Sequence, residues 1–212
     1  MKLKICGMKY PENMIEVASV APDYMGFIFY EKSSRYFTGT IPQLPSSIKK
    51  VGVFVKASDT EIIQKINYYR LDAVQLHGDE TPMFCKALRH QLKRTFPLKT
   101  IEIIKVFSVG NTFNFDQLMP FQDHCDYFLF DTKGKLPGGN GETFNWQLLE
   151  HYTFTKPYFL SGGIGLENIE ALEKFKNKAI SKYCYAIDVN SKFEIEPGLK
   201  DKEKLQQLKN TL

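Results

Sequence analysis

The sequence lacks the features that accompany export, membrane insertion or metal binding. Within its 212 residues, no stretch approaches the ~18 consecutive apolar residues of a membrane helix. The N-terminal segment reaches a proline and charged residues too early to hold the apolar region of a signal peptide. The four cysteines are scattered, without a CxxC pair or metal-ligand spacing, so disulfides are not expected. We expect a soluble, cytoplasmic protein with free thiols and no membrane partner.

A strong charge imbalance and flexible linkers are also missing. The net charge is only +4, and lysines and glutamates are interspersed without a basic stripe, so a nucleic-acid partner is not indicated. This mild excess suits an anionic small molecule. No linker or low-complexity segment rich in Pro, Gly or Ser interrupts the chain. Residues 1–212 are therefore expected to form one domain, with a hydrophobic content of 43% that is ordinary for a globular protein.

Short apolar runs recur along the chain at intervals close to one βα unit. Amphipathic helical patterns lie between several of them, at 59–69, 80–92, 165–175 and 201–212. An Asp cap is expected at residue 59. The segment after the second run is expected to be mostly loop with one short helix. The apolar runs occupy 2–6, 24–29, 51–55, 73–77, 101–107, 127–131, 157–161 and 184–189.

Eight strands alternating with helices predict a compact (β/α)8 barrel. A doubly wound open sheet is the alternative, since strand order cannot be read from the sequence. Alternate strand residues point to opposite faces, and the helix-facing set should be apolar. Cys6, His77, Asp131 and Asp188 should therefore face the barrel lumen at the C-terminal ends of their strands, where barrels of this kind carry their active sites. The competing interpretation of Cys6 is a small buried hydrophobe.

Glycines follow the seventh run, in SGGIG at 161–165. Gly162 and Gly163 lack a Cβ and can approach a phosphate closely, and Ser191, Lys192 and Phe193 can open a short helix facing the same group. A tight turn without a ligand is the alternative. The glycine-rich segment 134–146 is either a loop that closes over a ligand or a solvated connection.

The chain resembles the phosphoribosylanthranilate isomerase family of tryptophan biosynthesis, from Lys4 to Asp201. The resemblance rests on motifs that occur in a fixed order: KICGM, GFIF, SSRYF, VGVF, VQLHGDE, FDTKGKLPGGNGETFNW, LSGGIGLENI and IDVNSKFEIEPGLKD. It implies an Amadori rearrangement of an aminoaldose phosphate without a metal or organic cofactor.

The resemblance also implies roles for individual residues. Cys6 would be the general base and Asp131 the general acid. Arg35 would hold the anthranilate carboxylate, and Asp188 would contact the ribose hydroxyls or the substrate nitrogen. The implied phosphate ligands are Gly162, Gly163, Ser191 and Lys192, whereas His77 would be either a supporting residue or a core histidine.

The sequence departs from the family pattern in two places. Lys9 stands where threonine is common, and Asn190-Ser191-Lys192 replaces the usual Ser-Ser-Gly. Losing that glycine removes one close backbone approach to the phosphate. The Lys192 side chain either compensates with its charge or points to solvent.

The acid and the base need opposite protonation states. Asp131 must hold a proton when it acts, which burial or a nearby anion promotes. A thiol titrates near ~8.5, so Cys6 needs help to become a thiolate. Lys4 lies on the same strand face, roughly 7 Å away by strand rise. Our hypothesis is that Lys4 or a helix N-terminus favours the thiolate of Cys6.

Other functions remain open at this point. The aminoaldose isomerase of histidine biosynthesis would need a second phosphate loop and an Asp in place of Cys6. Indole-glycerol-phosphate synthase would need a catalytic Lys/Glu set and an added N-terminal segment. A non-catalytic barrel that binds a phosphorylated ligand, or a Cys6–His77 nucleophile pair, is also possible. The sequence leaves a monomer and a homodimer equally open.

Overall fold

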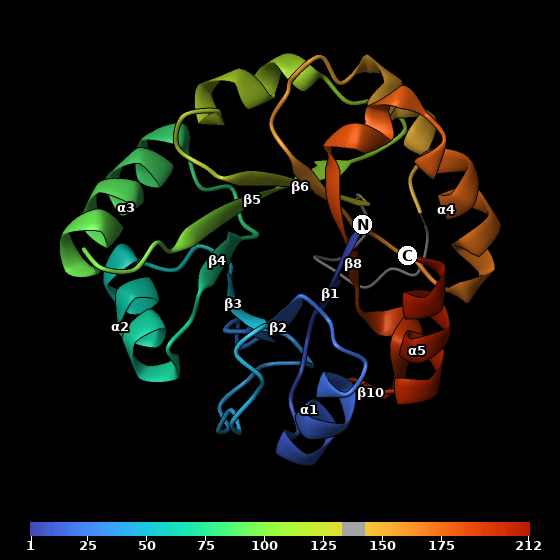
Figure 1. The fold of residues 1–212 in the computed structure, drawn as a ribbon. Helices are drawn as coiled ribbons and strands as arrows, with labels where there is room; N and C mark the ends of the chain where they lie inside the picture. The colour runs from blue at the N-terminus through green and yellow to red at the C-terminus, as the bar shows by residue number, and fades with distance from the viewer. Residues whose placement is uncertain (133–142) are drawn as a thin grey trace.

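The protein is a closed barrel of parallel strands, seen along its axis in Figure 1. The computed structural model describes residues 1–132 and 143–212. The strands follow one another around the barrel in chain order, and β8 pairs in parallel with β1. This pairing rules out the open sheet and confirms the predicted (β/α)8 barrel. The strands are β1 (Lys2–Ile5), β2 (Tyr24–Ile28), β3 (Lys49–Phe54), β4 (Ala73–Leu76), β5 (Glu102–Val109), β6 (Tyr127–Thr132), β7 (Tyr158–Leu160) and β8 (Cys184–Val189).

All the apolar runs found in the sequence are strands, because a parallel strand covered on both faces needs apolar residues at nearly every position. A helical layer surrounds them (Figure 1). The α-helices are α1 (Pro11–Ala18), α2 (Asp59–Tyr69), α3 (Pro82–Thr95), α4 (Ile169–Lys176) and α5 (Lys202–Thr211). The two chain ends lie side by side, and the Met1 ammonium donates to the Leu212 carbonyl at 3.4 Å.

Shorter 3₁₀ helices replace α-helices in part of the outer layer. After β5 and β6 the chain forms η1 (Phe115–Phe121) and η2 (Trp146–His151). The expected short helix after β2 is wrong, because residues 29–48 form turns and one bridge between Ile28 and Tyr36. Pro42 and Pro45 lie in this segment and lack the N–H that a helix interior needs.

The helix starts explain two other boundaries. The cap of α2 is Ser58, whose hydroxyl accepts from the Glu61 N–H, so the Asp cap expected at residue 59 is one position too late. Thr81 caps α3 in the same way, with Pro82 in the first turn as the sequence indicates. The segment 165–175 divides into η3 (Leu166–Asn168) and α4.

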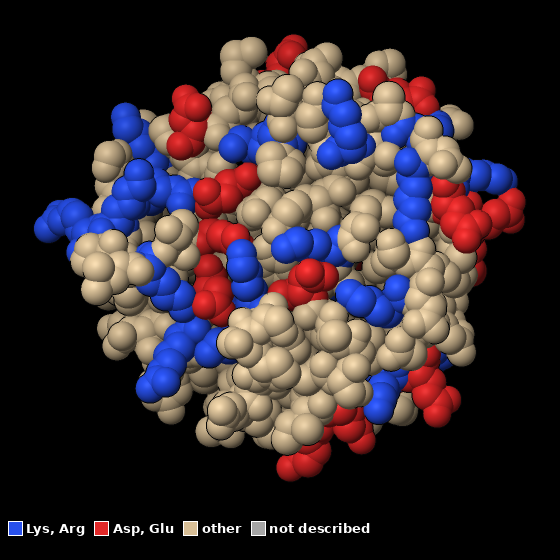
Figure 2. Space-filling model, viewed as in Figure 1, with Lys and Arg blue, Asp and Glu red and all other residues tan. Residues whose placement is uncertain are grey.

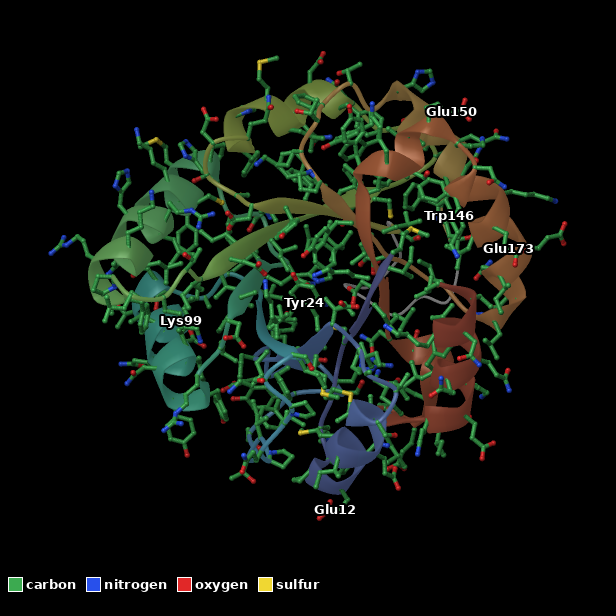
Figure 3. All side chains as sticks on the ribbon, in the orientation of Figure 1. Glu12, Tyr24, Lys99, Trp146, Glu150 and Glu173 are labelled. Carbon is green, nitrogen blue, oxygen red and sulfur yellow. The ribbon has the colours of Figure 1, made fainter. Side chains whose placement is uncertain are left out.

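Two apolar layers hold the barrel. Alternate strand residues fill the lumen, and Figure 3 shows Tyr24 within the ring of strands while Glu12, Glu150 and Glu173 lie at the periphery. The opposite strand faces pack against the helices in a second, larger cluster. The lumen cluster contains Tyr24, Val51, Ala73, Ile104, Val106, Leu129, Phe159 and Ala186.

One buried lysine breaks the expected apolar pattern of the helix-facing side. Lys105 pairs in register with Leu76 and Phe128, which belong to the outer cluster, so its side chain faces outward. Its ammonium lies 3.0 Å from the Glu80 carboxylate and donates to the Gly78 carbonyl at 2.7 Å. Glu80 also accepts from the Gly78 N–H. The ion pair therefore anchors the turn that follows β4.

Charges of both signs share the molecular surface. In the view of Figure 2, Lys and Arg alternate with Asp and Glu around the centre of the face. Among the described residues, no helix has the length and apolar character needed to cross a membrane.

We predict that Glu80→Gln lowers the free energy of unfolding by about 3–5 kcal/mol, because it leaves the Lys105 ammonium buried without its counter-ion. Denaturant unfolding measures this change. Glu80→Gln combined with Lys105→Met should recover part of the loss, since both charges are then gone.

Glu170→Gln is the matched control, because the Glu170–Lys174 pair is exposed on α4. It should leave the unfolding curve unchanged. Equal unfolding curves for Glu80→Gln and the wild type would contradict a structural role for the buried pair.

Candidate active site

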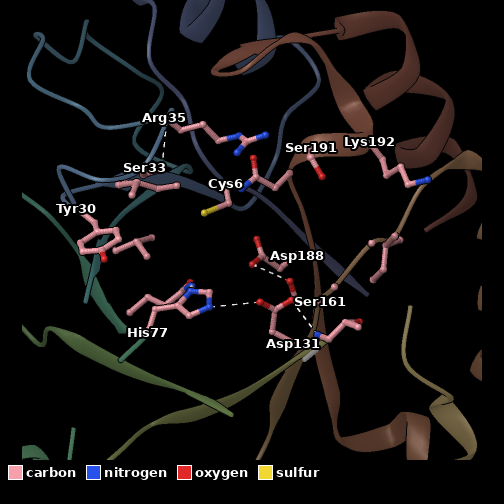
Figure 4. Close-up of a pocket in the computed structure, with 18 of the residues that line it drawn as sticks. Cys6, Tyr30, Ser33, Arg35, His77, Asp131, Ser161, Asp188, Ser191 and Lys192 are labelled. Atoms are coloured by element: carbon pink, nitrogen blue, oxygen red, sulfur yellow. Dashed lines mark hydrogen bonds and ion pairs between the residues drawn. The ribbon is translucent and has the colours of Figure 1, made fainter. Parts of the chain in front are cut away.

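One pocket gathers every candidate site residue at the C-terminal ends of the strands (Figure 4). Its space is about 900 Å³ when the open solvent at its mouth is included. Val53, Val55 and Ile28 supply an apolar wall. The candidate residues that line it are Cys6, Arg35, His77, Asp131, Gly162, Gly163, Asp188, Ser191 and Lys192.

Cys6 follows β1 directly and is fixed by the barrel seam. Its N–H donates to the Val189 carbonyl at 2.9 Å, and the residue is only 5% exposed. Gly7 next to it has φ +77°, and a Cβ there would stand 2.7 Å from Arg35 Cδ and from Asn190 Oδ1. The glycine after Cys6 thus lets Arg35 and Asn190 pack closely against the backbone next to the thiol.

Beneath the thiol lies a buried ion pair across the same seam. The Lys4 ammonium donates to Asp188 Oδ1 at 2.8 Å, and both side chains are buried. Burial is the largest single effect and lowers the pKa of Lys4, but the charge and hydrogen bond of Asp188, together with the smaller effect of Cys6, outweigh it and leave that pKa raised. Ser161 donates to the other Asp188 oxygen at 3.3 Å.

The pKa of Cys6 is shifted in the opposite direction to our hypothesis, which expected a favoured thiolate. Burial raises it, and although Lys4 and Lys200 both act to lower it, they do not overcome the burial. Cys6 is therefore a neutral thiol in the free protein. Lys4 works in the predicted direction, but with less effect than the loss of water.

Asp131 belongs to a chain of polar contacts on the other side of the pocket. His77 Nε2 lies 3.3 Å from Asp131 Oδ2, and the Gln75 amide nitrogen lies 3.2 Å from His77 Nδ1. The tautomer of His77 sets which group donates in each of these two contacts. The second Asp131 oxygen accepts from the Thr132 N–H at 3.0 Å. His77 is thus aimed at Asp131 (Figure 4).

The loops after β7 and β8 form the third side of the pocket. Gly162 has φ +91°, and a Cβ there would stand 2.3 Å from the Thr132 nitrogen, so only glycine fits against the end of β6. The expected short helix after β8 is present as η5 (Ser191–Phe193). The Lys192 ammonium lies 2.7 Å from Glu167 Oε1, which joins the two loops.

Arg35 already has a partner in this structure. Its Nε and Nη2 donate to the Glu194 carboxylate at 2.8 and 2.6 Å. Glu194 lies in β9 (Glu194–Glu196), which pairs with β10 (Leu199–Lys200) beyond the barrel. Sequence reasoning gave no role to Glu194, Lys200 or Gln75. The first two lie in the IDVNSKFEIEPGLKD motif and the third in VQLHGDE, so only their motifs marked them.

Metal binding has no candidate among the described residues, where no cluster of three or more His, Cys, Asp or Glu side chains is found. Most of the glycine-rich segment 134–146 lies outside the described residues, so neither interpretation of it is tested.

Comparison with known proteins gives one consistent result. Residues 3–211 match the model of the N-(5'phosphoribosyl)anthranilate (PRA) isomerase family. The N-(5'-phosphoribosyl)anthranilate isomerase of Parabacteroides distasonis is 41% identical, over 97% of this chain and 90% of its own length.

Solved structures agree with the sequence match. The phosphoribosyl anthranilate isomerase of Thermotoga maritima superposes with a TM-score of 0.80 at 30% identity, over 100% of this chain and 98% of that one. A phosphoribosyl anthranilate isomerase in complex with reduced 1-(o-carboxyphenylamino)-1-deoxyribulose 5-phosphate superposes with a TM-score of 0.74 at 27% identity, over 100% and 97% of the two chains.

We predict that an uncharged alkylating reagent modifies Cys6 slowly at neutral pH and that the rate keeps rising beyond pH 9, because burial raises the pKa of this thiol. Cys6 lines the pocket, whereas Cys85 and Cys184 are buried in the outer cluster and should remain unmodified. Peptide mapping by mass spectrometry measures each site. A rate that levels off below about pH 8 would show a stabilised thiolate instead.

Proposed function

Since the chain belongs to the N-(5'-phosphoribosyl)anthranilate isomerase family, an aldose–ketose isomerase of tryptophan biosynthesis, we propose how its pocket divides the reaction between acid, base and binding groups. The observation that carries the proposal is that Cys6 and Asp131, from β1 and β6, line one pocket together with all the proposed binding residues. Residues 1–212 act as one barrel domain in this proposal.

Asp131 is the proposed general acid. It donates a proton to the ribose ring oxygen, and the ring then opens to a Schiff base. The adjacent His77 Nε2, 3.3 Å from Asp131 Oδ2, orients the carboxyl group and gives its anion a partner after the proton has left. His77 is thereby a supporting residue in the pocket rather than a core histidine.

Cys6 is the proposed general base. It removes the proton from ribose C2, which produces an enolamine that tautomerises to the ketone. The thiol must first lose its own proton to water, and burial opposes this in the free protein. A protonated Schiff base next to Cys6 supplies the missing positive charge, and Lys4 adds to it. The thiolate of Cys6 is thus stabilised only after the protonated Schiff base has formed.

The remaining pocket residues hold the two ends of the substrate. Arg35 faces the anthranilate carboxylate and Asp188 the ribose hydroxyls or the substrate nitrogen. The phosphate lies between the β7 and β8 loops, against Gly162, Gly163, Ser191 and Lys192. The reduced compound bound by the solved relative carries these same three parts, which supports an extended site of this kind.

A covalent mechanism with a Cys6–His77 pair is disfavoured by the histidine contacts. Both ring nitrogens have other neighbours, with Gln75 at Nδ1 and Asp131 at Nε2. The proposed setting is the cytoplasm, and the proposed partner is the small-molecule substrate alone. Assembly as a monomer or a homodimer is decided by light scattering of the purified protein.

We predict that Cys6→Ala and Asp131→Asn each lower kcat by about 10²–10⁴-fold, the usual contribution of a positioned acid or base. Loss of substrate fluorescence with freshly made phosphoribosylanthranilate measures the rate. Wild-type turnover itself tests the function.

Cys85→Ala and Asp123→Asn are the matched controls, because Cys85 lies in α3 within the outer cluster and Asp123 is exposed. Both should retain wild-type kcat. Full activity in Cys6→Ala would require a different base and would leave that cysteine as core filling.

We predict that Lys192→Met raises the inhibition constant of inorganic phosphate about three- to tenfold at low salt, because the ammonium is a charged ligand of the phosphate. Glu167→Gln should lower it, since it releases Lys192 from the ion pair. Lys174→Met on α4 is the control. Equal inhibition of Lys192→Met and the wild type would mean that Lys192 serves only to join the two loops.

A further inference from the structure

A buried cluster of charged side chains lies directly behind Arg35, outside the pocket lining. Glu194 is its centre, 5% exposed, and accepts from Arg35 on one side and from the Lys200 ammonium at 2.6 Å on the other. The Gly198 N–H donates to the same carboxylate at 3.1 Å. Lys200 is buried, and it also donates to Asn190 Oδ1 at 2.7 Å. These hydrogen bonds and ion pairs all join residues of the protein to one another and lie away from solvent.

The charges of this cluster do not cancel. Arg35 and Lys200 carry two positive charges and Glu194 one negative charge, so the cluster holds one uncompensated positive charge. Burial works against the charge of Glu194, but its two cationic neighbours outweigh burial and leave the pKa of Glu194 lowered. The carboxylate thus stays ionised. A buried cluster with a positive surplus favours an anionic ligand at the nearest open face.

The open face of the cluster is one edge of the Arg35 guanidinium. Nε and Nη2 are held by Glu194, whereas the one contact of Nη1 among the described residues is with Ser34 Oγ at 3.5 Å. Arg35 lines the pocket above Cys6, while Glu194 and Lys200 do not (Figure 4). A planar guanidinium gripped along one edge presents its other edge in a fixed direction.

We propose that Glu194 is a positioning residue that, together with Lys200, fixes Arg35 as a preformed receptor for the carboxylate of the substrate's aromatic ring. This inference rests on the proposed function, which places that carboxylate at Arg35. Glu194 sets the direction of the guanidinium, and Lys200 restores the positive charge that Glu194 would otherwise neutralise. Without Lys200, the Arg35–Glu194 pair is electrically neutral and a carboxylate loses most of its attraction.

Lys200 makes this receptor sensitive to pH. Burial lowers the pKa of Lys200 to about 8 despite the attraction of Glu194. The other charged or titratable groups that face it are Arg35, which adds to the lowering, and Cys6, which opposes it. Lys200 is protonated below this pKa and neutral above it. The positive surplus is thus present at pH 7 and lost toward pH 9.

The first test is a double-mutant cycle between Arg35→Met and Glu194→Gln, with binding measured by calorimetry. The probes are reduced 1-(o-carboxyphenylamino)-1-deoxyribulose 5-phosphate and the same compound without its ring carboxylate. Glu194→Gln should weaken binding of the carboxylate compound about tenfold and of the second compound less than about twofold. In the Arg35→Met background, Glu194→Gln should have little further effect, because its role passes through Arg35.

Glu196→Gln is the matched control, since Glu196 lies two residues along in β9 and is exposed. It should bind both compounds as the wild type does. Additive effects in the cycle, or equal weakening for the two compounds, would overturn the proposal and leave Glu194 a structural residue. Wild-type turnover reports separately on the proposed function, so failure of one does not imply failure of the other.

The second test uses the wild type alone, in case Glu194→Gln does not fold. Binding of the carboxylate compound should weaken about tenfold from pH 7 to pH 9, while binding of the compound without the carboxylate stays nearly constant. The phosphate is already dianionic over this range, so it does not contribute. Parallel behaviour of the two compounds would overturn the role of Lys200.

Discussion

The pocket depends on the seam that closes the barrel. β1 and β8 pair in a register that places Lys4 opposite Asp188, and the side chains of these two residues form a buried ion pair at 2.8 Å. A one-residue shift of either strand would turn its member of this pair toward the helices, because successive strand residues face opposite sides. The seam also brings Cys6 beside Val189 and Asn190. The β1–β8 pairing therefore positions the Cys6 thiol, the cluster behind Arg35 and the loops after β7 and β8 relative to one another.

The charged side chains around the pocket form two ion pairs and one cluster that carries a net positive charge. Lys4 and Asp188 balance each other in the dry interior, which keeps the base of the pocket neutral. The Arg35 cluster keeps a positive surplus at one side. Lys192 and Glu167 form a more exposed pair at the loops, where water weakens their attraction. A ligand with two separated anionic ends fits this distribution, because each end finds a cation that is held in place.

Much of this organisation is predictable from the sequence, and the exceptions have physical causes. The strands were found because both faces are covered, and the positions of Cys6, Asp131 and Asp188 followed from period-two alternation. The pairing of Arg35 with Glu194 was not found, because it joins residues 159 apart through loop geometry. The net shift in the pKa of Cys6 depends on burial, which composition does not reveal. The outward-facing side chain of Lys105 in β5 was not predicted, because its partner Glu80 lies in the turn after β4.

The closing seam also sets when the site can exist during synthesis. Lys4 and Asp188 are 184 residues apart in the sequence, which is the largest sequence separation among the ion pairs around the pocket. At about 5–20 residues per second, translation delivers the second partner roughly 10–40 s after the first. Until then the edge of β1 that pairs with β8 has no neighbouring strand. An unpaired strand edge can pair with another chain, which leads to aggregation. The barrel's last strand thus protects the first one and completes the pocket in the same step.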